Sequence, residues 1–212
     1  MEHDQSYPHF KIRHLKAKRR CNSKEALQWK AGRSVPGTYQ RAIIMSKDTQ
    51  LRLVELSEQD LQQIYDMLQG IAANENEFKN EVNGMPYSEF PVWISRMEAW
   101  SRGEQLPDGY VPQTIFILYD GGTPVGMGKI RHRLTEYSRN IGGNIGYAIS
   151  AGHRGKGYGT ELMRLLAQKA DEMGISEKLA TVEVYNPASK RAIEKAGGKL
   201  VKETAERWYF EF

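Results

Sequence analysis

Hydrophobic and polar positions along this chain follow two rhythms. Alternation with a period of two predicts strands, and apolar positions spaced three or four apart predict amphipathic helices. Strands are expected at residues 51–56, 114–119, 125–134, 143–149, 179–185, 199–204 and 207–212. Helices are expected from Ser57 or Glu58 to Ile71, and at 87–100, 160–173 and 187–196. The order β α α β β β α β α β β predicts one mixed α/β domain.

The first 44 residues follow neither rhythm and differ in charge from the rest. They carry ten Lys and Arg against three Asp and Glu, whereas residues 45–212 carry 20 against 23, so the net charge of +4 comes from the N-terminal segment. We predict a disordered basic arm at 1–44 and a folded domain at 45–212. Three interpretations of the arm stay open: the run Lys11–Arg20 binds an anionic partner, the arm is a solvated tail, or translation starts at Met45.

Composition narrows the class of protein. Hydrophobic residues make up 40% and charged residues 26%, as in soluble globular proteins. No stretch approaches the ~18 consecutive apolar residues of a membrane span. The single cysteine, Cys21, excludes an internal disulfide framework and a cysteine-based metal cluster. These features predict a cytoplasmic protein without a metal and with no membrane partner, and binding of nucleic acid by the domain is not expected.

The stretch with the clearest chemistry is a glycine-rich turn between a predicted strand and a predicted helix, Arg154-Gly-Lys-Gly-Tyr-Gly159. Glycines without side chains expose successive backbone N–H groups, and the following helix adds its partial positive charge. Such a turn suits a diphosphate. The spacing fits neither a Walker A loop nor a dinucleotide-binding fingerprint, and a tight strand-to-helix connection without a ligand is the alternative.

The neighbouring strands support a ligand. In the strand 143–149, Gly146 and Ala148 share one face, and small residues let a ligand approach the backbone. The strand 179–185 is followed by Asn186 and Pro187, a pair typical of a helix N-terminus. A cap and a ligand contact are compatible roles for Asn186.

The two motifs together resemble the GNAT superfamily of N-acetyltransferases. Its signature [QR]-x-x-G-x-[GA] is matched by Arg154–Gly159, and its second signature by Asn186-Pro-Ala-Ser189 with Lys195-Ala-Gly-Gly198. The resemblance covers roughly residues 50–212. It implies a mostly antiparallel mixed α/β sheet with a central splayed pair of parallel strands, 143–149 and 179–185, and flanking helices. The implied reaction transfers acetyl from acetyl-CoA to an amine of a small molecule or a protein N-terminus.

The resemblance also implies where the coenzyme binds. The pantetheine arm would pair with the backbone of Tyr147–Ile149, the diphosphate would sit on the N–H groups of Gly155–Thr160, and Asn186 and Ser189 would lie beside the arm. The expected coenzyme-binding residues are Tyr147, Ala148, Ile149, Arg154, Gly155, Lys156, Gly157, Tyr158, Gly159, Thr160, Asn186 and Ser189.

The catalytic residues stay unassigned. The family often has a tyrosine seven residues after its Asn, and that position holds Ile193 here. A free amine must form before attack, so a base or a water chain is needed. The candidate acids and bases are Glu183, Tyr147, Tyr185, His132 and His153, each with an ordinary structural role as its alternative. The departure at Ile193 motivates a rival function, a non-catalytic acyl-CoA-binding or sensing module.

The acceptor pocket is expected between the helix 87–100, the hairpin 114–134 and the C-terminal strands. Its aromatic candidates are Trp93, Trp100, Tyr137 and Trp208, for which core packing is the alternative interpretation. The sequence does not name the acceptor, and it is compatible with a monomer or a homodimer.

Overall fold

A computed structural model of the chain describes residues 44–45, 51–57 and 60–212. The predicted basic arm lies outside these residues except for its last one, Ile44. Ile44 and Met45 form β1 (Ile44–Met45) and pair antiparallel with Leu53 and Arg52. The arm and the boundary of the domain at residue 45 therefore stay predictions.

The larger sheet has five strands in the order β1-β2-β5-β6-β7, and every neighbouring pair is antiparallel. Apolar residues on both of its faces explain why helices cover it on both sides. Its remaining strands are β2 (Leu51–Glu55), β5 (Gln113–Asp120), β6 (Thr123–Arg131) and β7 (Ile145–Ile149).

A second sheet is formed by the C-terminal strands in the order β8-β10-β9, also antiparallel. Its strands are β8 (Leu179–Glu183), β9 (Lys199–Glu203) and β10 (Arg207–Glu211). A short hairpin, β3 (Asn74–Glu75) with β4 (Phe78–Lys79), completes the strands of the described residues.

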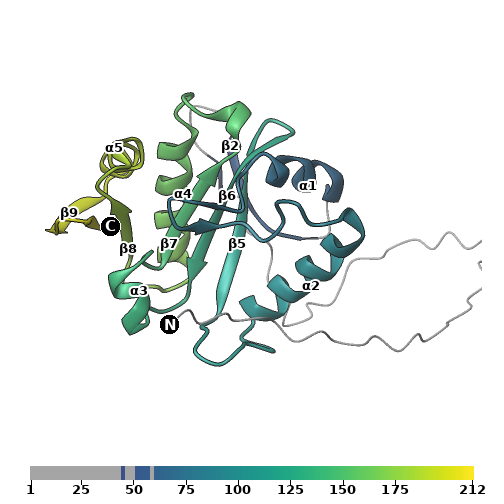
Figure 1. Cartoon of the computed structure of the whole chain (residues 1–212), viewed down its shortest axis with the longest axis horizontal. Coiled ribbons are helices and arrows are strands. Elements are labelled where there is room, and N and C mark those ends of the chain that lie inside the picture. Colours follow the sequence, from purple (N-terminus) through teal and green to yellow (C-terminus); the bar gives the residue numbers. More distant parts are fainter. Residues whose placement is uncertain (1–43, 46–50, 58–59) are drawn as a thin grey trace, which may run out of the picture. The chain divides into compact units, whose positions relative to one another are not determined.

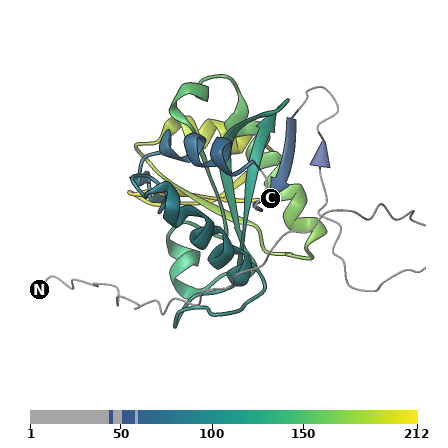
Figure 2. The same ribbon diagram turned by 90° about the vertical axis from the view of Figure 1, so that its right-hand side faces the viewer.

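Helices cover the two faces of the larger sheet, as Figures 1 and 2 show. On one face, α1 (Leu61–Gln69), the short 3-10 turn η1 (Tyr87–Glu89) and α2 (Phe90–Ser101) enclose one hydrophobic cluster. On the other face, α4 (Tyr158–Glu172) encloses a second cluster. There α4 packs against β6 and β7, and α5 (Pro187–Lys195) packs against α4. Two short helices remain, α3 (Glu136–Asn140) and the 3-10 turn η2 (Ala151–His153).

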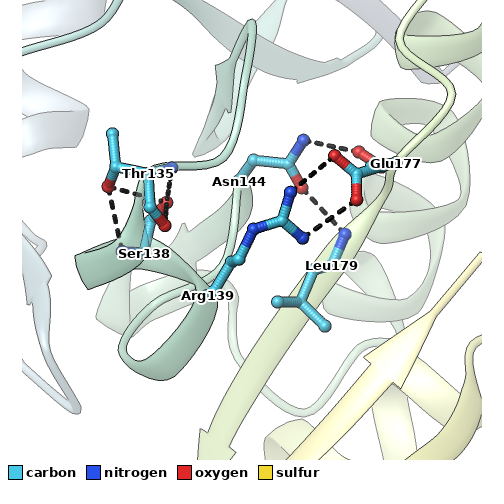
Figure 3. Close-up of polar contacts among 6 residues, drawn as sticks. All are labelled: Thr135, Ser138, Arg139, Asn144, Glu177 and Leu179. Atoms are coloured by element: carbon cyan, nitrogen blue, oxygen red, sulfur yellow. Dashed lines mark hydrogen bonds and ion pairs between the residues drawn. The ribbon is translucent and has the colours of Figure 1, made fainter.

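The strands β7 and β8 touch at one end only. The buried Asn144, directly before β7, holds the start of β8: its Nδ2 donates to the carbonyl of Glu177 (2.7 Å), and its Oδ1 accepts from the N–H of Leu179 (2.8 Å; Figure 3). Its own N–H donates to the carbonyl of Leu179 (2.9 Å). Gly143 is required beside it, because a Cβ there would lie 2.0 Å from that carbonyl oxygen.

Beyond this point β7 and β8 form no ladder, so the predicted splayed pair is present. The predicted fold class, mostly antiparallel with flanking helices, is confirmed. The structure divides the strands into two sheets because the splay removes the hydrogen bonds that would join them. A helical crossover through α4 connects the two strands, and both begin at the joined end.

Candidate functional site

A cleft of about 1040 Å³ lies between the diverging strands. Both strands contribute its walls, together with the start of α4, one side of α5 and the β3–β4 hairpin. Eleven of the twelve coenzyme-binding candidates line it; these are Tyr147, Ala148, Ile149, Arg154, Gly155, Gly157, Tyr158, Gly159, Thr160, Asn186 and Ser189. The twelfth, Lys156, is outside the lining, and its Nζ donates to the carbonyl of Gly152 (3.3 Å).

Backbone N–H groups at the open end of the cleft are free. From Gly155 to Gly159, no backbone N–H donates to any acceptor in the described part of the chain. The N–H of Thr160, which was expected to be free as well, donates to the carbonyl of Gly157 (3.0 Å). Gly155 (φ 76°) and Gly157 (φ 87°) lie in the left-handed region, which turns the chain into α4 without a side chain in the way. At Gly159 a side chain is excluded by contact and not by backbone conformation, because a Cβ there would lie 2.9 Å from the ring of Tyr147.

The charge of Arg154 is already neutralised. Its two terminal nitrogens donate to the carboxylate of Glu75 in the β3–β4 hairpin (2.9 and 2.7 Å), and its Nε donates to the carbonyl of Ile149 (3.0 Å). The positive potential at the loop therefore comes from the bare N–H groups, the N-terminus of α4 and the side chain of Lys156, which has no ion pair among the described residues.

The backbone of β7 uses one of its two edges to pair with β6. The N–H of Arg131 donates to the carbonyl of Asn144 (2.8 Å), and the N–H of Ser150 donates to the carbonyl of Val125 (3.1 Å). These bonds fix which residues of β7 exchange hydrogen bonds with β6, since such residues alternate along an antiparallel strand.

Because of this alternation, only two of the three β7 residues that were expected to pair with the pantetheine arm direct their backbone groups into the cleft. Ala148 directs its N–H and carbonyl toward β6, whereas Tyr147 and Ile149 direct theirs toward the cleft. The bond from Arg154 to the carbonyl of Ile149 agrees with this assignment. Backbone pairing with a ligand in the cleft is thus available to Tyr147 and Ile149, and Ala148 contributes only a small side chain.

The helix after β8 begins as its sequence predicts. The Oδ1 of Asn186 accepts from the N–H of Ser189 (3.1 Å), with Pro187 as the first residue of α5. The hydroxyls of Tyr147 and Ser189 are 3.3 Å apart and join β7 to α5 across the cleft. Burial raises the pKa of Tyr147, so this phenol stays protonated at neutral pH.

A match to a protein family identifies this architecture. Residues 75–198, more than half of the chain, match the sequence profile described as Acetyltransferase (GNAT) family. The chain belongs to the GNAT acetyltransferase family. Acetyl transfer that depends on acetyl-CoA is the activity of this class of enzyme, and the family suggested by the two sequence motifs is confirmed. No curated protein sequence matches the chain.

Solved structures of GNAT acetyltransferases share the fold. RimL, the ribosomal L7/L12 alpha-N-protein acetyltransferase in complex with coenzyme A, has a TM-score of 0.60 at 14% identity, over 81% of this chain and 97% of that chain. The Microcin C7 self-immunity acetyltransferase MccE, with acetyl-CoA and AMP, has 0.55 at 15%, over 78% and 92%. The spermidine N-acetyltransferase of Vibrio cholerae, with CoA and spermine, has 0.51 at 16%, over 76% and 95%.

The candidate acids and bases of this GNAT acetyltransferase occupy different surroundings. Glu183 ends β8 and lines the cleft; one of its oxygens accepts from the hydroxyl of Tyr185, and its buried Oε2 has no partner in the described residues. That hydrogen bond raises the pKa of the exposed Tyr185. His153 also lines the cleft, with a buried Nδ1 that has no described partner. Ile193, at the position where the family often has a tyrosine, is buried in the core. The helix α5 therefore offers no phenol as a proton donor.

His132 lies outside the lining of the cleft. Its Nε2 is 2.8 Å from the hydroxyl of Thr114, and burial lowers its pKa. A neutral histidine bonded to a threonine on β5 has an ordinary structural role, which agrees with the alternative interpretation of this residue.

The aromatic candidates for the acceptor pocket separate into two groups. Trp100 and Tyr137 line the cleft. Trp93 is buried and stacks on Phe90 with ring centroids 5.7 Å apart, and Trp208 packs against the hydrophobic cluster around α4. Core packing is therefore the role of the second group.

Sequence reasoning missed two contributors to the cleft. One is the β3–β4 hairpin, which supplies Glu75, Glu77 and Phe78 to the lining; Glu77 forms a two-pronged ion pair with Arg207 on β10. The other is a pair of cations on β6, Lys129 and Arg131. Their alternate spacing in an otherwise apolar strand is the signal that could have found them.

Among the described residues, no group of three or more His, Cys, Asp or Glu side chains could hold a metal ion. No helix of the described segments combines the length and the apolarity needed to cross a bilayer.

Proposed function

We propose that this enzyme transfers the acetyl group of acetyl-CoA to a primary amine, on a small molecule or at a protein N-terminus. The observation that carries the proposal is the run of free N–H groups at Gly155–Gly159, at the mouth of a cleft whose wall is an unpaired strand edge. Free backbone donors beside a helix N-terminus suit a diphosphate, and an unpaired strand edge suits an extended chain that carries amides.

In this proposal the loop and β7 hold successive parts of the coenzyme. The N–H groups of Gly155–Gly159 bind the diphosphate, and the cleft-facing groups of Tyr147 and Ile149 bind the pantetheine amides. Acetyl-CoA supplies the thioester that is attacked. An N–H group of β7 that faces the cleft then donates to the oxygen on which negative charge develops, and donors fixed in a strand need no reorganisation for this task.

Glu183 is the residue that we propose as proton acceptor. Glu183 lines the cleft, and its buried Oε2 has no protein donor among the described residues, so this oxygen keeps its capacity to accept a proton from an amine or a bridging water. The hydroxyl of Tyr185 holds the other oxygen of the carboxylate in place. The protonated amine gives one proton to this carboxylate, and the free amine attacks the thioester carbon. The C–S bond then breaks, and the departing thiolate takes up the second proton that the nitrogen loses as the amide forms.

The test is release of coenzyme thiol from acetyl-CoA in the presence of an amine panel. The panel contains amino acids, aminosugars, polyamines and peptides with free N-termini. We expect saturable turnover with one class of amine and a product heavier by one acetyl group. Tight binding of acetyl-CoA without turnover on any amine would instead support the acyl-CoA-binding module. Loss of coenzyme binding would reject both functions.

A further inference from the structure

Two cations in the cleft have no carboxylate partner. Lys129 and Arg131 lie two residues apart on β6, so their side chains share a face, and both line the cleft. The Nζ of Lys129 donates to the carbonyl of Lys79 (2.5 Å) and lies 4.6 Å from the ring centroid of Phe78. Arg131 donates to the carbonyl of Gly143 (2.9 Å). Neither residue takes part in an ion pair among the described residues.

Two other arginines at the cleft are compensated: Arg154 pairs with Glu75, and Arg207 on β10 pairs with Glu77. Arg191 on α5 also lines the cleft without an ion pair among the described residues, but it is exposed, whereas Lys129 and Arg131 lie close together and partly buried. Burial, and then the charge of Arg131, lowers the pKa of Lys129 to about 8 against the opposing charge of Glu81, and burial lowers the pKa of Arg131. Partly buried cations without an ion-pair partner are unfavourable for the free enzyme and favourable for an anion that reaches them.

The position of the two cations separates them from the coenzyme loop. Lys129 is opposite Gly146 and Arg131 is opposite Asn144, at the joined end of the cleft. The loop follows Ser150 at the other end. With a rise of about 3.3 Å per residue, four to six residues of β7 place the backbones of the cations roughly 13–20 Å from the loop. A diphosphate on the loop therefore leaves them unoccupied.

We propose that Lys129 and Arg131 form a subsite that binds an anionic group, a carboxylate or a phosphate, carried by the acceptor amine. This inference rests on the proposed function and adds the class of its substrate. The guanidinium suits a two-pronged contact to a planar anion, and the ammonium adds a point charge beside it. Trp100, Tyr110 and Tyr137 line the same part of the cleft and give the body of the acceptor aromatic contacts.

The decisive experiment compares acceptors in matched pairs. One pair is an amino acid and its amide, and the other is a hexosamine phosphate and the free hexosamine, so the two arms distinguish carboxylate from phosphate. We expect the anionic member of one pair to have a kcat/KM roughly tenfold or more above its neutral partner, as for a hydrogen bond to a charged group. Equal or higher values for both neutral members would overturn the subsite while leaving acetyl transfer intact.

Variants assign the preference to the two residues. Lys129→Met and Arg131→Met should each raise KM for the anionic acceptor about tenfold, change KM for its neutral partner little and leave coenzyme affinity unchanged. Arg131→Lys should keep part of the preference. Lys199→Met, on the exposed β9, removes the same charge outside the cleft and should change nothing. Equal losses for both acceptors would indicate that Lys129 only anchors the hairpin, and weaker coenzyme binding would assign the cations to a coenzyme phosphate; either result overturns the proposal.

A measurement without turnover keeps the inference testable if no amine of the panel is acetylated. Inorganic phosphate and acetate are titrated into the enzyme while modification of Lys129 by an amine reagent is followed by peptide mass mapping. Bound anion stabilises the protonated amine, so one of the two should slow modification of Lys129 at pH 8 severalfold relative to chloride of equal ionic strength, and not that of Lys199. Unchanged modification of Lys129 by both anions would reject the subsite.

Discussion

The two ends of β7 treat their polar groups in opposite ways. At the joined end, the buried side chain of Asn144 satisfies the carbonyl of Glu177 and the N–H of Leu179 (Figure 3). At the open end, successive N–H groups from Gly155 to Gly159 have no acceptor in the described residues. Buried polar groups are almost always paired in native proteins, and Asn144 provides that pairing at the first end. The N–H groups of the second end lie in an exposed loop, and in our proposal they bind the diphosphate of the coenzyme.

The largest effect is expected from a negative charge placed at the open end. Aspartate and asparagine both tolerate the left-handed conformation of Gly157, and they differ mainly in charge. A carboxylate a few ångströms from a diphosphate costs about 4 kcal/mol near a protein surface. Gly157→Asp should therefore weaken coenzyme binding roughly a thousandfold by calorimetry, and Gly157→Asn far less. Equal affinities of the two variants would remove the diphosphate from this loop.

The next largest effect concerns stability at the joined end. Asn144→Ala removes the partners of the buried N–H of Leu179 and of the partly buried carbonyl of Glu177, and it should lower the free energy of unfolding by about 3 kcal/mol. Asn140→Ala is the control, since this exposed side chain bonds only the carbonyl of Glu136 in its own helix. Its effect should stay within about 0.5 kcal/mol in denaturant unfolding. A comparable loss in both variants would show that Asn144 does not fix the strand pair.

A smaller effect, on catalysis alone, is expected from Glu183. Glu183→Gln keeps the size of the side chain and its bond from Tyr185 but removes the base, and should lower kcat about a hundredfold, with coenzyme affinity unchanged. Glu203→Gln on the exposed β9 serves as the control. If kcat of Glu183→Gln equalled that of the wild type, Glu183 would not be the proton acceptor, and water or another group would remove the proton.

The smallest effect is a pH dependence of stability. The pKa of Lys129 is lowered to about 8 in the folded protein, by burial, Arg131 and Lys79 against the opposing charge of Glu81. Between pH 8 and about 10.4 the unfolded chain binds the extra proton, so the free energy of unfolding rises with pH across this window. The difference between the wild type and Lys129→Met should show that rise, damped by solvent because the side chain is partly exposed. A flat difference would mean that the amine is not destabilised by its surroundings.

Much of this architecture follows from local sequence. The longer strands and helices were predicted because each has a clear period of two or of three to four, and the glycine-rich loop because its residues are contiguous. The cap at Asn186 needs only the next three residues. In these segments, hydrophobic periodicity and helix capping determine the secondary structure, and contacts with distant segments do not change it.

The parts that could not be predicted depend on contacts between distant segments. The β3–β4 hairpin has a short polar sequence without alternation, and it is held by Arg154 and Arg207, 79 and 130 residues away along the chain. The roles of Lys129 and Glu183 depend on which faces of β6 and β8 border the cleft, and pairing register decides that. The predicted starting point of the first helix was also early: α1 begins at Leu61, after Asp60 in a left-handed conformation.

The pairing of Arg154 with Glu75 has a consequence for how the enzyme responds to its medium. A ligand held by whole charges loses affinity steeply as electrolyte is added, because mobile ions compete for those charges. With Arg154 neutralised in advance, Lys156 is the remaining whole charge of the loop, and in our proposal most of the grip comes from oriented peptide dipoles at short range, which electrolyte screens poorly. Added salt should therefore weaken binding of the coenzyme less than binding of an anionic acceptor.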